Sequence, residues 1–414
     1  MAFSSLGLSP ALLRALERND LLNPTPIQAQ AIPAALSGSD ILAQAQTGSG
    51  KTLAFGLPLL QTLESQGTPK PRRARALVLV PTRELAVQVG QVLRELAQQL
   101  PHEIRISVVF GGVSINPQMM AMRGGTDVIV ATPGRLLDLV KRNALVLGAV
   151  HTLVLDEADR LLDLGFEAEL QALLELLPAR RQTLFFSATY AQPVAQLATA
   201  LLRHPVRIEI ASTEETRPDI QQRAILVEPN QRTQLLRHLI TTGRWQRVLV
   251  FVATKHAAEI VADKLRKAQI DAEPFHGELS QGKRSQVLAD FKASRLQVVV
   301  ATDVASRGLD IAELPVVVNY DLPRSTADYT HRIGRTGRAG ESGLAISLVS
   351  HATEAHFRLI EKRHGLQVAR EVVPGFEPGP APAPAADAAP NNGGIKGKRP
   401  SKKDKLRALA GKQS

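Results

Sequence analysis

The chain alternates short apolar runs with longer amphipathic stretches, and it does so twice. From Ile41 the runs are DILAQA, RALVLV, IRISVVF, DVIVAT, HTLVLDEAD, TLFFSAT and VRIEI. The alternation restarts with RAILVE, RVLVFVAT, IDAEPFHG, LQVVVATD, PVVVNYD and GLAISLVS. Runs rich in β-branched residues that alternate with helical stretches are typical of a parallel sheet covered by helices. The sequence therefore predicts two consecutive α/β domains, each a parallel sheet flanked by helices.

Changes in composition mark the boundaries of these domains. Residues 211–222, ASTEETRPDIQQ, are polar and lack apolar periodicity, so we expect a linker between a first domain at 1–210 and a second at 223–370. From residue 371 the sequence consists of a Pro/Ala spacer followed by a basic segment. We expect residues 371–414 to form a disordered tail, because such a composition cannot bury a core.

Positive charge is concentrated in the last part of the sequence. The formal net charge is +11, and residues 391–414 hold 8 Lys or Arg and 1 Asp, a net +7. A cationic segment on a nearly neutral body indicates a polyanionic partner, and nucleic acid fits better than membrane because the segment lacks an amphipathic anchor. The alternative is a segment that only keeps the protein soluble.

Cysteine is absent from the chain. This excludes a disulfide scaffold, a thiolate metal site and a cysteine nucleophile, and it suits a reducing cytosol, so we expect a cytoplasmic protein. Apolar runs stay well short of the roughly 18 residues that a membrane span needs. The opening segment MAFSSLGLSPALLRALERND does not resemble a signal peptide, and we expect no membrane partner.

A glycine-rich segment, AQTGSGKT at residues 45–52, lies where an expected strand gives way to an expected helix. Gly48 and Gly50 would let backbone N–H groups crowd around an anion. Lys51 could place its charge on the β and γ phosphates of ATP, and the Thr52 hydroxyl could hold Mg²⁺. The strict phosphate-loop pattern has Gly at position 45, where this chain has Ala. The alternative is a glycine-rich turn without a ligand.

Two acidic residues, Asp156 and Glu157, end the apolar run LVLDEAD. The carboxyl ends of parallel strands carry the chemistry of α/β proteins. There Asp156 could hold Mg²⁺ through its water shell, while Glu157 could orient or deprotonate the attacking water. The alternative is that both acids only cap the following helix.

Two further segments make the pattern specific. SAT, Ser187–Thr189, follows another expected strand, and PTPIQ, residues 24–28, precedes the phosphate loop. In this order the motifs resemble those of DEAD-box ATPases of helicase superfamily 2, and the resemblance extends from Phe3 to about Gly340. It implies two tandem RecA-like domains and an RNA-stimulated ATPase that locally separates short RNA duplexes. The chain is most similar to the bacterial RhlE-type members.

The resemblance also implies roles at the nucleotide. Gln28 would read the adenine edge, since its amide offers both a donor and an acceptor. Ser187 and Thr189 would belong to the catalytic set. Thr52 and Asp156 would hold Mg²⁺, partly through water. The residues expected to bind ATP are Gln28, Thr47, Gly48, Ser49, Gly50, Lys51, Thr52 and Asp310.

The chain departs from this family at the base. The spacing from Phe3 to Pro24 places Asp20 and Leu21 where the family has Gly and then an aromatic residue that stacks on adenine. Leucine lacks the π face, so we expect a weaker grip on the base. The alternatives are that Leu21 points into the core or that Phe3 already covers the base.

The segment HRIGRTGR, residues 331–338, carries four cationic or titratable side chains at fixed spacing. Such a density of positive charge repels itself unless an anion is supplied. By the resemblance, Arg335 and Arg338 reach across to the γ-phosphate as arginine fingers, and Asp310 contacts the ribose. The alternative is a solvated basic face.

By the same resemblance, several loops that follow expected strands form a path for RNA. They offer hydroxyl, guanidinium and backbone N–H groups, which suit contacts with phosphate and sugar, and this predicts RNA binding with little sequence specificity. Taken singly, each could be a helix cap. The residues are Pro81, Thr82, Arg83, Gly112, Thr132, Arg135, Gln281, Arg284 and Thr302.

Two other classes of function stay open at this point. One is an RNA-binding clamp that turns over ATP poorly, which the departure at Leu21 would suit. The other is a DNA translocase of the same superfamily, which the DEAD tetrad together with PTPIQ argues against. The sequence leaves the protein partners and the oligomeric state unknown.

Overall fold

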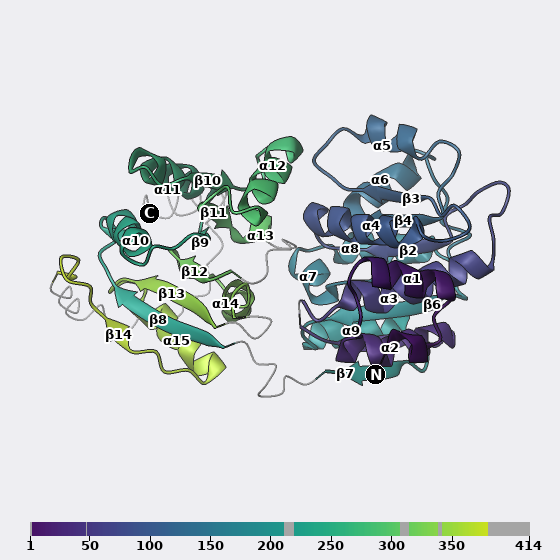
Figure 1. Cartoon of the computed structure of the whole chain (residues 1–414), viewed down its shortest axis with the longest axis horizontal. Coiled ribbons are helices and arrows are strands. Elements are labelled where there is room, and N and C mark those ends of the chain that lie inside the picture. Colours follow the sequence, from purple (N-terminus) through teal and green to yellow (C-terminus); the bar gives the residue numbers. More distant parts are fainter. Residues whose placement is uncertain (1, 47, 211–218, 307–313, 338–341, 380–414) are drawn as a thin grey trace, which may run out of the picture.

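The computed structural model describes residues 2–46, 48–210, 219–306, 314–337 and 342–379. Three of the expected site residues, Thr47, Asp310 and Arg338, lie outside these ranges, as do most of the expected linker and the basic segment of the expected tail. Figure 1 shows the described part as two α/β lobes.

The first lobe is built on a seven-stranded sheet in the order β3-β4-β2-β5-β6-β1-β7, and every pair in it is parallel. Parallel strands need crossover connections, and here they are helices, as the alternating sequence predicts. The strands are β1 (Ile41–Gln44), β2 (Ala76–Leu79), β3 (Ile106–Val109), β4 (Val128–Ala131), β5 (Thr152–Leu155), β6 (Gln182–Ser187) and β7 (Val206–Glu209).

Helices cover both faces of this sheet. Successive strand residues point to opposite faces, so Val154 joins the core cluster on one side and Leu153 and Leu155 join the cluster on the other. The first cluster includes the short 3₁₀ turn Phe3–Leu6 and helices α1 (Pro10–Arg18), α2 (Pro26–Leu36), α3 (Lys51–Ser65) and α4 (Arg83–Ala97). The second includes α5 (Ile115–Ala121), α6 (Pro133–Lys141), α7 (Ala158–Asp163), α8 (Glu167–Glu175) and α9 (Gln192–Leu201).

The second lobe repeats this plan with a parallel sheet in the order β10-β11-β9-β12-β13-β8-β14. Its strands are β8 (Ile220–Leu226), β9 (Val248–Val252), β10 (Ala272–Phe275), β11 (Val298–Thr302), β12 (Val316–Asn319), β13 (Gly343–Val349) and β14 (Arg370–Glu371). Its helices are α10 (Arg232–Thr242), α11 (Lys255–Lys267), α12 (Gln281–Lys292), α13 (Asp303–Ser306), α14 (Thr326–Ile333) and α15 (Glu354–His364). The predicted fold class is confirmed.

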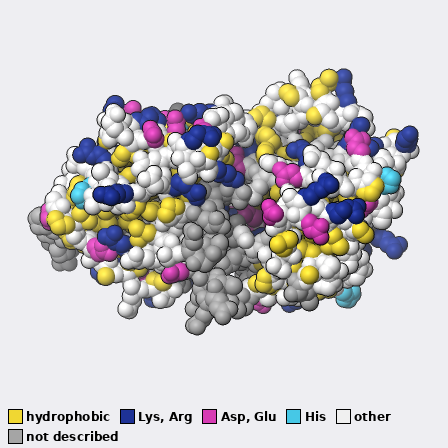
Figure 2. Space-filling model, viewed as in Figure 1, with side chains coloured by type: hydrophobic (Ala, Val, Ile, Leu, Met, Phe, Trp, Pro, Cys, Tyr) yellow, Lys and Arg dark blue, Asp and Glu magenta, His cyan; other side chains and the backbone are white. Residues whose placement is uncertain are grey.

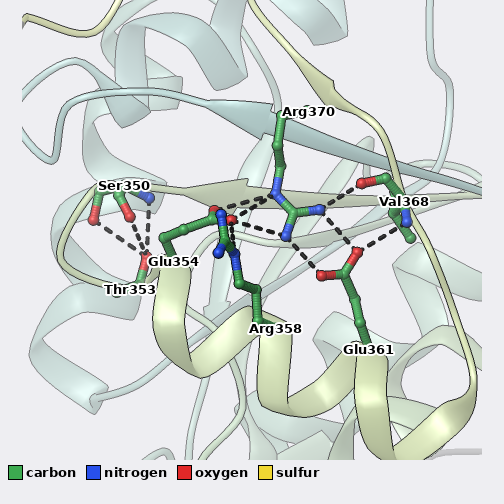
Figure 3. A network of polar contacts seen from close by, with 7 residues as sticks. All are labelled: Ser350, Thr353, Glu354, Arg358, Glu361, Val368 and Arg370. Atoms are coloured by element: carbon green, nitrogen blue, oxygen red, sulfur yellow. Dashed lines mark hydrogen bonds and ion pairs between the residues drawn. The ribbon is translucent and has the colours of Figure 1, made fainter. Parts of the chain in front are cut away.

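The ordered part of the second lobe extends beyond residue 370, where the sequence predicted its end. Strand β14 pairs with β8 at the sheet edge, and Val373 and Phe376 pack on the core cluster of β9 and α11. Figure 3 shows what holds this end: the Arg370 guanidinium lies between the carboxylates of Glu354 and Glu361 on α15. In the part of the chain that the structure describes, no helix is long and apolar enough to cross a membrane.

Candidate nucleotide and RNA site

The strand order of the first sheet separates the expected nucleotide residues from the expected RNA residues. The phosphate loop follows β1, Asp156 and Glu157 follow β5, and Ser187 ends β6; these three strands are neighbours. The expected RNA residues of this lobe follow β2, β3 and β4, which are also neighbours. The carboxyl edge of one sheet therefore presents two adjoining regions.

The phosphate loop holds its lysine against its own backbone. Lys51 is buried, and its Nζ donates to the carbonyl oxygens of Ala45 at 2.9 Å and Gln46 at 3.4 Å. Gly50 has φ +90 and a Cβ added there would lie 2.4 Å from the Gln28 amide nitrogen, so only glycine fits this turn. Ser49 Oγ is buried and finds no hydrogen-bond partner among the described residues.

The buried Gln28 joins α2 to this loop. Its Oε1 accepts from the Thr25 backbone N–H at 2.9 Å, and its Nε2 donates to the Gly50 carbonyl at 3.1 Å. Thr25, which the sequence reasoning did not single out, donates its hydroxyl to the Ser49 carbonyl at 2.8 Å. The helix-entry turn and the phosphate loop are thus one hydrogen-bonded unit.

The acidic pair, Asp156 and Glu157, directly follows β5 and is buried. Asp156 is fully buried, and burial raises its pKa from 3.8 to about 6, against the opposing pull of the Lys51 charge. Glu157 adopts φ 51, a left-handed conformation uncommon outside glycine, at the start of α7. Its side chain makes no capping hydrogen bond to that helix, so the helix-cap alternative does not describe Glu157.

The last acid of the tetrad, Asp159, is a residue that the sequence reasoning missed. Its Oδ2 accepts from the Thr189 backbone N–H at 3.1 Å and from the Thr189 hydroxyl at 3.0 Å. Ser187 in turn donates its hydroxyl to the Thr189 carbonyl at 2.7 Å. Asp159 therefore ties the SAT segment to α7, and the tetrad itself was the signal that could have found it.

The second lobe contributes the segment that begins at His331. Arg332 pairs within this lobe: its Nε and Nη2 donate to the two oxygens of Asp303 at 2.6 and 2.7 Å. Asp303, on α13, therefore neutralises part of the positive charge of the segment. Arg335 is buried one turn further on. Burial lowers the pKa of His331 to about 3, with Arg160 of the first lobe as the next cause.

Within the described part of the chain, two ion pairs join the lobes, and the sequence reasoning predicted neither. Arg160 on α7 reaches Asp328 on α14 at 3.1 Å beside the nucleotide region. Glu84 on α4 meets Arg284 on α12 at 2.7 Å beside the RNA region, and both side chains are buried. Burial is the main cause that raises the pKa of Glu84. Arg284 also stacks over Phe275, 4.8 Å from the ring centroid.

Several of the expected RNA residues of the first lobe lie close together. Arg83 lies so close over Gly112 that a Cβ added there would be 1.8 Å from its Nη2. The buried Arg135 donates to the Val113 carbonyl at 2.7 Å, while its Nε and Nη1 make no hydrogen bond among the described residues. Thr82 caps α4 by accepting from Leu85, which is the structural role left open for it.

The remaining RNA candidates lie on the second lobe. Gln281 and Arg284 share the first turn of α12, with Arg284 already paired across the lobes, and Thr302 ends β11. Pro81 and Thr132 follow β2 and β4 directly, and Thr132 accepts from the Gly111 N–H at 3.3 Å. These positions do not test whether the residues contact RNA, so their RNA-binding roles stay predictions.

At the expected adenine position, Leu21 is half-buried and packs on the core cluster that contains Phe3. Leu22 is 66% exposed. Leu21 is thus in contact with the core, as the alternative expects, but part of the residue remains exposed.

A phosphate loop, a buried carboxylate pair and a second lobe that pairs with the first beside them are the features of a two-domain ATPase. Known sequences and structures agree with this class. The description DEAD/DEAH box helicase matches residues 25–197, and Helicase conserved C-terminal domain matches residues 230–340.

Curated relatives share the whole two-domain body. The DEAD-box ATP-dependent RNA helicase CshA of Bacillus cereus is 41% identical over 360 residues, which is 87% of this chain and 67% of that protein. CshA of Geobacillus kaustophilus is 40% identical over 87% of this chain and 76% of that protein. The chain belongs to the DEAD-box family of ATP-dependent RNA helicases. The predicted activity and the predicted RNA partner are confirmed.

Solved structures give the same result. Saccharomyces cerevisiae Dbp5 bound to RNA and ADP BeF3 matches with a TM-score of 0.79 at 32% identity, over 90% of this chain and 95% of that one. Mss116p bound to ssRNA and AMP-PNP matches with a TM-score of 0.79 at 27% identity, over 92% and 80%. A Dbp5 variant bound to Nup159, Gle1, IP6 and ADP matches with a TM-score of 0.60 at 31% identity, over 89% and 96%.

Proposed function

We propose that the chain hydrolyses ATP only when its lobes close on RNA. Lys51 neutralises the β and γ phosphates, Glu157 orients and deprotonates the attacking water, and Arg335 stabilises the charge that develops on the γ-phosphate. Arg338 and Asp310, outside the described residues, are proposed to complete this set. The observation that carries the proposal is the direct ion pairing of the lobes beside both regions of the site.

The donor set fits Mg²⁺, which binds in such sites through one or two protein oxygens together with phosphates and water. Asp156 is a carboxylate whose pKa is raised to about 6 chiefly by burial, and a bound cation would favour its charged form. Thr52, the second residue of α3, offers a hydroxyl at the same loop. Mg²⁺ supplies charge stabilisation to the transferring phosphate.

The similarity to Dbp5 depends on what that protein has bound. At nearly equal identity and coverage the TM-score falls from 0.79 with RNA and ADP BeF3 to 0.60 with Nup159, Gle1, IP6 and ADP. A Dbp5 variant bound to Gle1 and IP6 falls between them, with a TM-score of 0.71. This chain is thus more similar to the RNA-bound form than to either of these complexes, and the likeness supports RNA as the ligand of the paired lobes.

RNA is proposed to run across the second region of the first sheet and on to α12. Figure 2 shows Lys and Arg side chains on both lobes with Asp and Glu among them, and no single continuous basic face in this view. Contacts with the RNA backbone would then come from separate loops, among them those of Arg83, Gly112 and Arg135. Bending one strand in this path would separate its partner strand locally.

Three further points concern the subfamily, the cellular location and the basic segment. The predicted RhlE-type placement has no support among the relatives above, which are named CshA, so the proposal stays with the family as a whole. A cytoplasmic location is proposed from the cysteine-free composition. The basic segment at residues 391–414 is proposed to tether RNA through phosphate contacts.

The test is steady-state ATP hydrolysis by the full chain with single-stranded RNA, with DNA of the same sequence, or with neither. We expect stimulation by RNA alone, by at least about tenfold, since RNA favours the closed site. Tight RNA binding without stimulation would instead identify a clamp. Equal stimulation by DNA would identify a translocase.

A further inference from the structure

The ion pair between Arg160 and Asp328 joins the two helices that adjoin the proposed catalytic side chains. Arg160 is the third residue of α7, which begins directly after Asp156 and Glu157. Asp328 lies in the first turn of α14, the helix that leads to Arg335. In Figure 1 these helices face each other between the lobes, and the Nη1 to Oδ1 distance is 3.1 Å.

This contact is well enclosed. The side chain of Arg160 is 6% exposed and that of Asp328 is 14% exposed. Charges removed from water interact strongly, and losing one partner leaves the other poorly solvated. Asp328 is itself held in place, because its Oδ2 accepts from the Ser325 hydroxyl at 2.7 Å. The pair therefore fixes where the start of α14 lies against α7.

Arg160 has a second acidic partner on its own helix. Nη1 also lies 3.2 Å from Asp163 Oδ2, one turn along α7, and the Asp163 side chain is 53% exposed. Arg160 therefore has one acidic partner within its own helix and one on the other lobe, and only the second depends on how the lobes are placed.

We propose that Arg160 and Asp328 are positioning residues that set α14, and with it His331 and Arg335, in register with the catalytic carboxylates when the lobes close. His331 is one turn after Asp328 and so shares its helix face. The contact with α7 thus orients two successive turns of α14. Neither residue touches the nucleotide in this assignment.

The inference rests on the proposed closure, so the experiment separates the two. Binding of labelled single-stranded RNA to the full chain is measured with AMP-PNP and Mg²⁺ and without nucleotide. If the wild-type protein binds RNA with the same affinity with and without the nucleotide, closure itself is contradicted. If closure holds, Asp328→Asn should weaken RNA binding about tenfold with AMP-PNP and less than about twofold without it, since only the closed state contains the pair.

The exchanged pair, Arg160→Asp with Asp328→Arg, keeps the summed side-chain length and should restore affinity with AMP-PNP to within about threefold of wild type. Asp163→Asn, the matched comparison on α7, should lower that affinity by less than about twofold, because the 3.2 Å contact of Asp163 with Arg160 lies within one helix and does not join the lobes. Melting temperatures of all variants should stay near wild type. Equal losses in both nucleotide conditions, or an exchanged pair no better than the single variants, would overturn the assignment.

Discussion

Glu157 combines a functional carboxylate with a backbone that most residues avoid. Its φ of 51 lies in the left-handed region, and its side chain is buried without capping α7. Uncommon conformations of this kind persist where the surrounding structure enforces them, and they gather at active sites. The left-handed turn after β5 suits the two different tasks proposed for Asp156 and Glu157.

The Glu157→Gln variant tests the role of the second acid. Glutamine keeps the shape and the hydrogen-bonding capacity but cannot accept a proton, so we expect hydrolysis to fall about a hundredfold or more at unchanged ATP affinity. The closed RNA complex should then dissociate more slowly. Single-turnover hydrolysis and nucleotide binding measure the two quantities, and near-normal turnover would remove Glu157 from catalysis.

Asp156 predicts a specific pH dependence of stability. Its folded-state pKa of about 6 lies above the ordinary 3.8, so the nucleotide-free protein loses stability as pH rises from about 4 to 6. Asp156→Asn should therefore be more stable than wild type above pH 6, by up to about 3 kcal/mol, and the gain should vanish near pH 4. Unfolding by urea at both pH values, with the exposed Asp138→Asn as control, measures this. A less stable variant at pH 7.5 would refute the burial cost.

Leu21→Phe tests the departure at the base. An aromatic ring adds about 0.5 to 1.5 kcal/mol of stacking, which corresponds to a two- to twelvefold lower KM for ATP at unchanged kcat. Because Leu21 is half-buried against the core, the melting temperature is measured on the same variant, with the exposed Leu22→Phe as control. Reduced stability without any gain in affinity would show that phenylalanine overpacks this site.

At the scale of elements, α15 and β14 complete the second lobe beyond the matched helicase region, which ends at residue 340. Arg370 joins them by bonding Glu354 and Glu361 at once (Figure 3). Its guanidinium also lies 4.7 Å from the Phe357 ring centroid. Planar guanidinium groups suit such paired contacts. The strand itself is two residues long, and this network helps to hold it in addition to its pairing with β8 and the ion pair of Arg223 with Glu371.

The Arg370→Ala variant tests that attachment. It removes contacts with two carboxylates and a ring, so we expect the second lobe to lose about 2 kcal/mol of stability. Arg358→Ala is the matched control, because Arg358 is 74% exposed and pairs only with Glu354 among the contacts drawn in Figure 3. That variant should change stability by less than about 0.5 kcal/mol. Equal effects of the two substitutions would contradict the assigned role of Arg370.

Sequence reasoning reached some of these features and missed others for physical reasons. The strands, the phosphate loop and the acidic pair are local patterns, so Lys51 and Asp156 could be read directly. Arg160 and Asp328 are separated by 168 positions, and nothing local indicates that they meet. The last strand was missed because its two residues carry no apolar alternation and Phe376 lies in Pro- and Gly-rich text.

At the scale of the whole molecule, each lobe holds only part of the chemistry. The first lobe carries Lys51, Asp156 and Glu157, and the second carries Arg335, so neither is expected to be an efficient ATPase alone. Among the described residues, two ion pairs cross the junction, Arg160 with Asp328 and Glu84 with Arg284. Interfaces between domains of one chain are generally more polar than permanent interfaces, which suits lobes that are proposed to open and close in each cycle.

The most direct test of this account is the distance between the lobes in solution. The chain has no cysteine, so Lys141→Cys on α6 and Lys264→Cys on α11, both exposed, provide one dye position per lobe. Energy transfer between the dyes is measured without ligand, with AMP-PNP, with RNA, and with both. The account predicts a distinct closed population only when AMP-PNP and RNA are present together. The same transfer efficiency in all four conditions would contradict it.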